Sequence, residues 1–118
     1  MVTIHGIRNC DSCRAARAWL RRHGIDHEYV DIRVDGLSAS QLERWQAAVG
    51  WEPLLNRRSI TWRKIPAFDR DNLDADTARA LILEHPTVMR RPVLDTGTGQ
   101  VLLGFDADRY QELLTGNT

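Results

Sequence analysis

Cysteine is scarce in this chain, and the sequence has no long apolar run. The only cysteines, Cys10 and Cys13, are too few for a secreted domain held together by disulfides. No stretch approaches the roughly 20 apolar residues of a membrane-spanning helix. The N-terminus, MVTIHGIRNC, lacks the basic and apolar regions of a secretory signal. We therefore expect a cytoplasmic protein that does not associate with membranes.

Net charge is absent as well. The chain has 16 lysines and arginines and 16 aspartates and glutamates, so its formal net charge is zero. Such a balance is not typical of proteins that coat nucleic acid, and we expect no direct nucleic-acid binding. With 118 residues, 42% of them hydrophobic, and no repeat or low-complexity segment, the chain is long enough to bury the core of a single domain.

The first part of the chain alternates between strand and helix patterns. Residues 2–7 and 28–32 are rich in β-branched and aromatic residues, which favour strands. Between them, residues 13–23 carry apolar side chains at helical spacing, and Gly24 ends that pattern. This order predicts a unit of strand, helix and strand.

The middle of the chain is predicted to be mainly helical. Ser40 and Glu43 have the spacing of a capping box and predict the start of a second helix. Residues 51–72 show no clean periodicity and contain prolines, so we expect a loop with a short helical turn. Asp74 or Asp76 is then expected to cap a third helix.

The end of the chain predicts a β-hairpin and a final helix. Two apolar runs flank residues 96–99, TGTG, whose glycines can adopt positive φ in a hairpin turn. Asp106 is expected to cap a helix that runs through Leu114. The elements together indicate a mixed α/β fold.

The strongest chemical feature is the pair of cysteines in the segment NCDSC, where the first strand gives way to the first helix. Unpaired N–H groups and a partial positive charge at a helix N-terminus stabilise an anion, so we expect Cys10 to be a thiolate. Arg8 and Arg14 are expected to add to this effect. Cys13, one helical turn later, is expected to be buried and to attack a mixed disulfide formed on Cys10.

Two other interpretations of the cysteines stay open. With His23 and His27 they approach the spacing of a two-cysteine, two-histidine zinc site, although in a zinc finger both cysteines precede the helix. Alternatively, both cysteines are half-buried and pack as small hydrophobic residues. We favour the redox pair and expect no metal.

Basic side chains cluster in two places. One cluster includes Arg57 and Arg58, and the other is Arg90 with Arg91, directly before Pro92. Guanidinium groups bind carboxylate, phosphate and arsenate oxygens in bidentate fashion. One arginine from each cluster facing the thiolate would therefore form an oxyanion or glutathione-carboxylate site. The alternative is a solvated basic surface.

Several longer motifs resemble a known family. The segments MVTIHGIRNCDSCRAARAWL, LLNRRSITWRK, EHPTVMRRPVL and LLGF are similar to the arsenate reductase-like (ArsC) family, which includes the Spx regulators and the YffB-like proteins. The segments RVDGL, GWEPLLN and TWRK most resemble the YffB-like branch. The resemblance implies a thioredoxin-like fold, a single domain over 1–118 with a helical insertion at approximately 33–85.

The resemblance also implies roles for individual residues. Cys10 is the nucleophile, Arg91 contacts the anion, and Pro92 is cis and faces Cys10. The middle arginine is Arg58 by the YffB-like and Spx pattern, but Arg57 by the ArsC spacing. The catalytic residues expected are therefore Cys10, Cys13, Arg58 and Arg91. The substrate-binding residues expected are Asn9, Arg57, Arg58, Arg91 and Pro92.

The function implied is a thiol reductase that uses glutathione as co-substrate and holds no bound cofactor. Arsenate reduction is a further alternative, but arsenate reductases of the family carry a histidine and a third arginine where this chain has Gly6 and Gly104, so we expect weak arsenate chemistry. Cys13 is unusual for the YffB-like branch and supports the alternative of an Spx-like redox regulator that binds the RNA polymerase α subunit. The end QELLTGNT, shorter than the charged tail of Spx, argues for the reductase. We expect a monomer.

Overall fold

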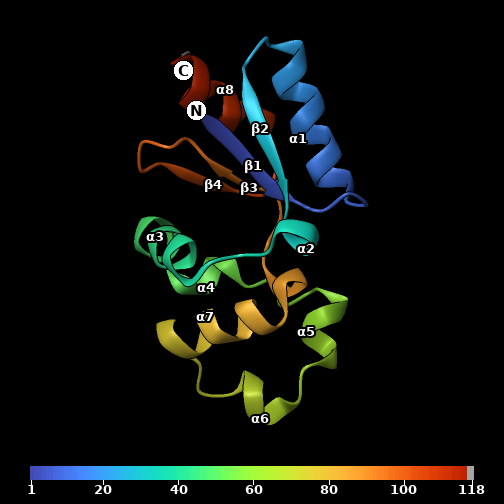
Figure 1. The fold of residues 1–118 in the computed structure, drawn as a ribbon, viewed down its shortest axis with the longest axis vertical. Helices are drawn as coiled ribbons and strands as arrows, with labels where there is room; N and C mark the ends of the chain where they lie inside the picture. Colours follow the sequence, from blue (N-terminus) through green and yellow to red (C-terminus); the bar gives the residue numbers. More distant parts are fainter. Residues whose placement is uncertain (117–118) are drawn as a thin grey trace. The chain divides into compact units, whose positions relative to one another are not determined.

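The computed structural model describes residues 1–116, which form two compact units (Figure 1). The first unit combines Met1–Asp31 with the segment from Arg91 onward, and the second is Ile32–Arg90. The insertion expected over 33–85 lies inside the second unit. None of the helices within residues 1–116 is both long and apolar enough to span a bilayer.

The first unit contains a four-stranded sheet in the order β2-β1-β3-β4. β1 and β2 are parallel, so the chain must cross over between them, and α1 makes that crossover. The other two strand pairs are antiparallel. The bounds are β1 Val2–Gly6, α1 Asp11–Arg22, β2 His27–Asp31, β3 Val93–Asp95 and β4 Val101–Leu103.

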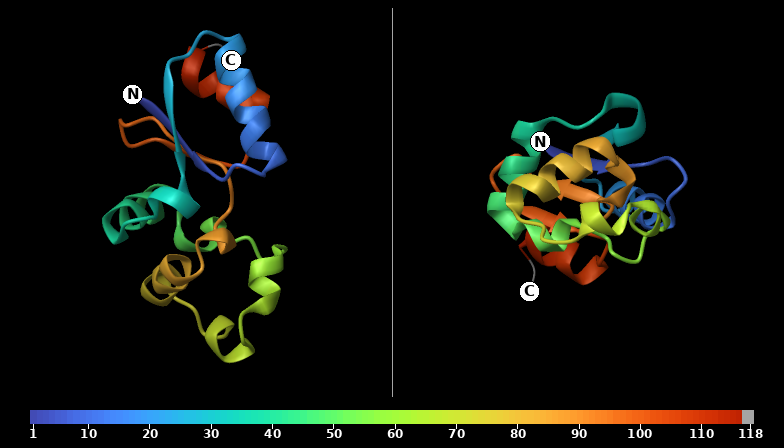
Figure 2. Two further views of the ribbon diagram at one scale, coloured as in Figure 1. Left: turned by 45° about the vertical axis from the view of Figure 1, so that its right-hand side comes forward. Right: turned by 90° about the horizontal axis from the view of Figure 1, so that it is seen from below.

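One face of the sheet packs against α1 and α8 (Ala107–Thr115). Ile4 of β1 and Leu94 of β3 are fully buried in a cluster with the apolar side of α1, as its helical spacing predicted. Tyr110 of α8 completes the cluster, because its ring meets Trp19 edge-on at a centroid distance of 5.7 Å. The two helices accordingly lie side by side (Figures 1 and 2).

The predicted hairpin and final helix are confirmed. β3 and β4 pair around the 96–99 turn, where Gly97 and Gly99 have φ values of 80° and 96°. The carboxylate of Asp106 accepts hydrogen bonds from the N–H groups of Asp108 and Arg109 and so caps α8.

The second unit is built from short helices. Helices α3, α4 and α7 pack on one another, and Leu42, Trp45 and Leu54 are fully buried among the apolar residues of this unit. An isolated bridge between Leu55 and Met89 ties the segment after α4 to the end of the unit. The bounds are α2 Ile32–Asp35, α3 Ala39–Val49, α4 Trp51–Leu54, α5 Ile60–Lys64, α6 Ala67–Arg70, α7 Ala75–Glu84 and η1 Pro86–Val88.

Two expectations for this middle segment are wrong. Helix α3 begins after Ser38, whose hydroxyl accepts from the Gln41 N–H, so the capping box is not formed by Ser40 and Glu43. Residues 51–72 contain three short helices, α4, α5 and α6, and not a loop with a single helical turn. Helices this short show too few turns to give a periodic pattern, and tertiary packing stabilises them. Of the two candidate caps for α7, Asp74 is the one observed.

Candidate active site

Strand pairing in the first unit brings two distant segments of the chain together. β1 and β3 are antiparallel, with His5 opposite Val93, so the end of β1 lies beside the start of β3. β1 leads into the turn before Cys10, and Arg91 lies two residues before the start of β3 at the same end of the sheet. The sheet thus delivers a thiol and a guanidinium to one place. The Arg91–Pro92 peptide bond is cis, as the resemblance implied.

Cys10 occupies the N-cap position of α1. Its backbone is extended, with φ −138° and ψ 119°, and its carbonyl oxygen accepts a hydrogen bond of 3.0 Å from the N–H of Arg14. The side chain caps nothing and is partly exposed. The helix begins at Asp11, earlier than the position 13 predicted from apolar spacing, because its first turn is polar. The thiol therefore stands at the positive end of the helix, open to a reactant.

The electrostatic surroundings favour the thiolate of Cys10. Partial burial opposes ionisation, yet the pKa of Cys10 is lowered because the backbone N–H and the thiol of Cys13 donate hydrogen bonds to it. Arg91 contributes a further hydrogen bond and its positive charge. Arg14, which was expected to help, forms an ion pair with Asp11 instead.

Cys13 has the opposite character. Its side chain is 1% exposed, and burial raises its pKa to about 12. The negative charge of Cys10 and the hydrogen bond to it act in the same direction. Both cysteines are free thiols. The arrangement therefore holds the proton on Cys13 and the negative charge on Cys10.

Sequence reasoning missed two side chains next to the cysteines. The guanidinium carbon of Arg17 lies 4.1 Å from the centre of the Tyr29 ring, a cation–π contact between α1 and β2. Burial raises the pKa of Tyr29, and the negative charge of Asp31 adds to this. The available signal was the helical spacing from Cys13 to Arg17, which places both on one side of α1.

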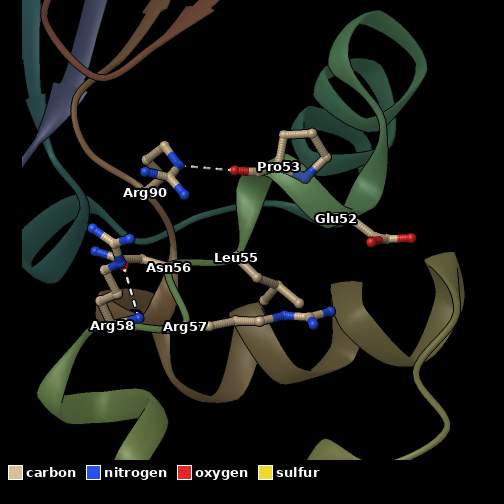
Figure 3. Close-up of a pocket in the computed structure, with 7 residues that line it drawn as sticks. All are labelled: Glu52, Pro53, Leu55, Asn56, Arg57, Arg58 and Arg90. Atoms are coloured by element: carbon tan, nitrogen blue, oxygen red, sulfur yellow. Dashed lines mark hydrogen bonds between the residues drawn. The ribbon is translucent and has the colours of Figure 1, made fainter.

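The middle arginines line a cavity in the second unit (Figure 3). Its volume is about 570 Å³. Arg90, from the second basic cluster, holds one wall through a hydrogen bond of 3.1 Å from its Nε to the carbonyl oxygen of Pro53. The full lining is Glu52, Pro53, Leu55, Asn56, Arg57, Arg58 and Arg90.

Arg57 and Arg58 differ in how their guanidinium groups are engaged. The two side chains leave the turn in different directions (Figure 3). The guanidinium of Arg57 lies 5.6 Å from the centre of the Trp62 ring, and that of Arg70 lies 5.6 Å from the same ring. The Arg58 guanidinium makes no hydrogen bond or ion pair with any other residue in 1–116, while its backbone N–H donates to Asn56 Oδ1 at 3.1 Å. The guanidinium of Arg58 is thus the less engaged of the two.

The expected site residues fall into two groups. Cys10, Cys13 and Arg91 meet in the first unit, and Asn9 is exposed in the turn just before Cys10. Arg57 and Arg58 belong to the second unit.

The zinc interpretation finds no support in the described part of the chain. The Nδ1 atoms of His23 and His27 lie within hydrogen-bonding distance of the backbone oxygens of Trp19 and Ile25, at 2.8 and 2.9 Å. Within residues 1–116, no three histidine, cysteine, aspartate or glutamate side chains gather in a way that would hold a metal ion.

Comparison with known proteins agrees with this architecture. A solved YffB protein superposes with a TM-score of 0.92 at 35% identity, covering 97% of this chain and 99% of that one. A protein of Haemophilus influenzae is 40% identical over 111 residues, 94% of this chain and 96% of the relative. The global transcriptional regulator Spx of Streptococcus agalactiae is 31% identical over 116 residues, 97% of this chain and 83% of the relative.

The family itself follows from a match along most of the sequence. Residues 5–113 match the model of the ArsC family. That span includes both cysteines, the middle arginines and the Arg91–Pro92 pair. The fold is the thioredoxin-like fold that the resemblance implied. The chain therefore belongs to the ArsC family.

Proposed function

We propose that this protein is a cytoplasmic thiol–disulfide oxidoreductase with glutathione as co-substrate. The observation that carries the proposal is the state of Cys10, a partly exposed thiol at a helix N-cap whose pKa is lowered by Cys13 and Arg91. A thiolate is the attacking species in disulfide exchange, so this cysteine is suited to react first. A glutathione pool and reduced thiols are features of the cytoplasm.

The reaction begins with a disulfide between glutathione and a second thiol compound. The Cys10 thiolate attacks the glutathione sulfur, forms a new sulfur–sulfur bond and expels the other sulfur as a thiolate, which takes a proton from water. The sulfur of Cys13 then attacks the Cys10 sulfur and breaks its bond to glutathione, which leaves as a thiolate and takes up the proton that Cys13 loses; a Cys10–Cys13 disulfide remains. Two further glutathione molecules supply the two electrons that restore both thiols and leave as oxidised glutathione.

The arginines supply charge for the glutathione carboxylates. Arg91 already interacts with the reactive sulfur, so it is suited to the part of glutathione that surrounds the new bond. The unengaged guanidinium of Arg58 is suited to a carboxylate, which guanidinium groups bind in bidentate fashion. We assign Asn9, exposed in the turn just before Cys10, to glutathione binding on the side of the first unit.

Mass spectrometry after treatment with oxidised glutathione tests this proposal. The wild type should lose two hydrogens and form the internal disulfide, while Cys13→Ser should keep one glutathione on Cys10. Cys10→Ser should keep none, because Cys13 is buried and its pKa is about 12. Glutathione trapped on Cys13, or on neither cysteine, would refute the assigned roles.

A second candidate function is a redox-responsive regulator of the Spx type. The pairing of Cys10 with a buried second thiol favours it, since an internal disulfide can act as a switch. Its relative in Streptococcus agalactiae is a global transcriptional regulator. Capture of the RNA polymerase α subunit by the oxidised and the reduced protein separates the two functions. Redox-dependent capture without turnover of glutathione disulfides would favour the regulator.

A further inference from the structure

Gly6 differs from every other glycine of the chain. The other seven all have positive φ, between 64° and 96°, and this conformation by itself favours glycine. Gly6 is the last residue of β1 and has no such φ. The reason for glycine at this position is therefore space, because glycine within a strand often marks a close approach by another group.

The group that approaches Gly6 is the thiol of Cys13. A Cβ built at position 6 would lie 2.5 Å from Cys13 Sγ and 3.2 Å from Cys13 Cβ. Atoms in van der Waals contact are normally about 3.5–4.0 Å apart. The Cys13 sulfur thus occupies the place that any side chain at position 6 would need.

The strand pattern explains why the sulfur is confined there. Ile4 and Gly6 are two positions apart on β1 and share the face that packs against α1. Tyr29 pairs with Ile4 from β2, and its Cε2 atom would lie 3.6 Å from the same Cβ. Arg17 covers the Tyr29 ring, so the ring and the Gly6 backbone border one small space that the Cys13 thiol fills.

We propose that Gly6 is a positioning residue of the redox site: by leaving room for Cys13 Sγ, it holds that thiol as a hydrogen-bond donor to Cys10. The Cys13 thiol thereby activates Cys10 before any disulfide forms, in addition to attacking it later. This inference rests on the proposed role of Cys10 as attacking thiolate and does not depend on glutathione. The lowered pKa of Cys10, to which the hydrogen bond from the Cys13 thiol contributes, agrees with this role of Cys13.

A side chain at position 6 would force the sulfur away. The backbone of α1 has little freedom to retreat, because Ala16 and Leu20 of the same helix are fully buried in the core. The Cys13 side chain must then turn, and its thiol ceases to point at Cys10. Cys10 would retain only Arg91 and the backbone N–H of Cys13.

The test is the pH dependence of Cys10 alkylation by iodoacetamide in the full chain, with the modified residue identified by mass spectrometry. Gly6→Ala should slow alkylation about tenfold at pH values below the wild-type pKa of Cys10. This tenfold change corresponds to an upward shift of the Cys10 pH profile by about one pH unit. Cys13→Ala should do the same, since it removes the donor. Cys13→Ser keeps a donor and should stay near the wild type.

The double variant Gly6→Ala/Cys13→Ala separates positioning from general damage. It should react like Cys13→Ala alone, because no sulfur is left to displace. The control is Gly24→Ala, which strains a residue at φ 64° with nothing within 4 Å and should lose stability without a change in the pH profile. If Gly6→Ala fails to fold, recovery of folding in the double variant supports the proposal, and its failure to recover overturns it.

Three results would overturn the inference. They are a wild-type profile in Gly6→Ala, a wild-type profile in Cys13→Ala, or an equal effect of Gly6→Ala with and without Cys13. A shifted profile in a protein that never forms a glutathione adduct would instead reject the proposed function alone. An adduct on Cys10 with an unshifted profile would reject this inference alone.

Discussion

The guanidinium of Arg91 donates a hydrogen bond to the sulfur of Cys10, although the two residues come from distant parts of the chain. The antiparallel pairing of β1 with β3 explains the meeting, since it aligns the end of one strand with the start of the other. The reactivity of the thiol therefore depends on tertiary structure as well as on its place at a helix terminus.

Arg91→Ala is expected to slow the alkylation of Cys10 at neutral pH by about three- to tenfold. Hydrogen bonds to charged groups contribute about 1.5–3 kcal/mol, and we discount this to about 0.7–1.4 kcal/mol because Cys10 is partly exposed to solvent. Arg91→Lys should lose less, since it keeps the charge. The matched control is Arg14→Ala, whose guanidinium pairs with Asp11. Equal rates in Arg91→Ala and the wild type would contradict the assignment.

Arg58→Ala is expected to slow adduct formation with oxidised glutathione several-fold more than Arg57→Ala does. Arg58 has an unengaged guanidinium, whereas that of Arg57 lies against Trp62. Stopped-flow measurement of the adduct in a Cys13→Ser background gives the two rates. The opposite order would select Arg57 as the anion ligand, as the ArsC spacing suggested.

Arsenate is expected to be a poor substrate in an assay with glutathione and glutaredoxin. The resemblance implies a thiolate-stabilising histidine at the position of Gly6 and an anion-binding arginine at that of Gly104, and the loss of each charge-assisted contact costs about 1–3 kcal/mol. Turnover should stay at the level of the Cys10→Ser variant, measured by arsenite formation. Saturable turnover clearly above that level would show that the remaining arginines suffice.

Acid should weaken the start of α7 through Asp74. Its pKa lies below the ordinary 3.8, first because of the hydrogen bond from the Thr77 N–H and then because of the Thr77 hydroxyl. A group with a depressed folded pKa stabilises the fold above its unfolded pKa, and this contribution is lost as the pH falls through the folded value. Asp74→Asn should therefore reduce the loss of stability below pH 3.8, as measured by urea unfolding. If the variant and the wild type lose the same stability at acid pH, the charge of the Asp74 cap contributes nothing.

Leu94→Ala should destabilise the protein by about 2–5 kcal/mol, because truncation of a buried leucine leaves a cavity in the core. Leu94 is fully buried between β3 and the helices α1 and α8. Val34, with 81% of its surface exposed, offers the comparison. Val34→Ala should change the free energy of unfolding by less than about 0.5 kcal/mol. Similar urea midpoints for the two variants would place Leu94 outside the stabilising core.

Helix α3 shows why a local sequence pattern does not fix the residue at which a helix starts. Ser38 with Gln41 and Ser40 with Glu43 both have capping-box spacing, and only the first pair forms the cap. The choice depends on where the chain turns from extended to helical backbone, which occurs at Ser38 with φ −105° and ψ 153°. The position of this change is set by the chain before the helix and by the residues that pack against it. The spacing of the capping residues carries no information about either.

The sequence alone determined those features that depend on residue type and local order. These are the parallel strands around a helix, the glycine turn of the hairpin, the cap at Asp106, and the placement of Cys10 before a helix with Cys13 one turn inside it. They are readable because hydrophobic period, positive φ and capping chemistry act over a few residues. Tertiary structure alone decided that Arg91 rather than Arg14 assists Cys10, and that Gly6 leaves room for the Cys13 sulfur. Both depend on atoms that meet across a sheet or between a strand and a helix, and the close packing that brings them together is not contained in any local pattern.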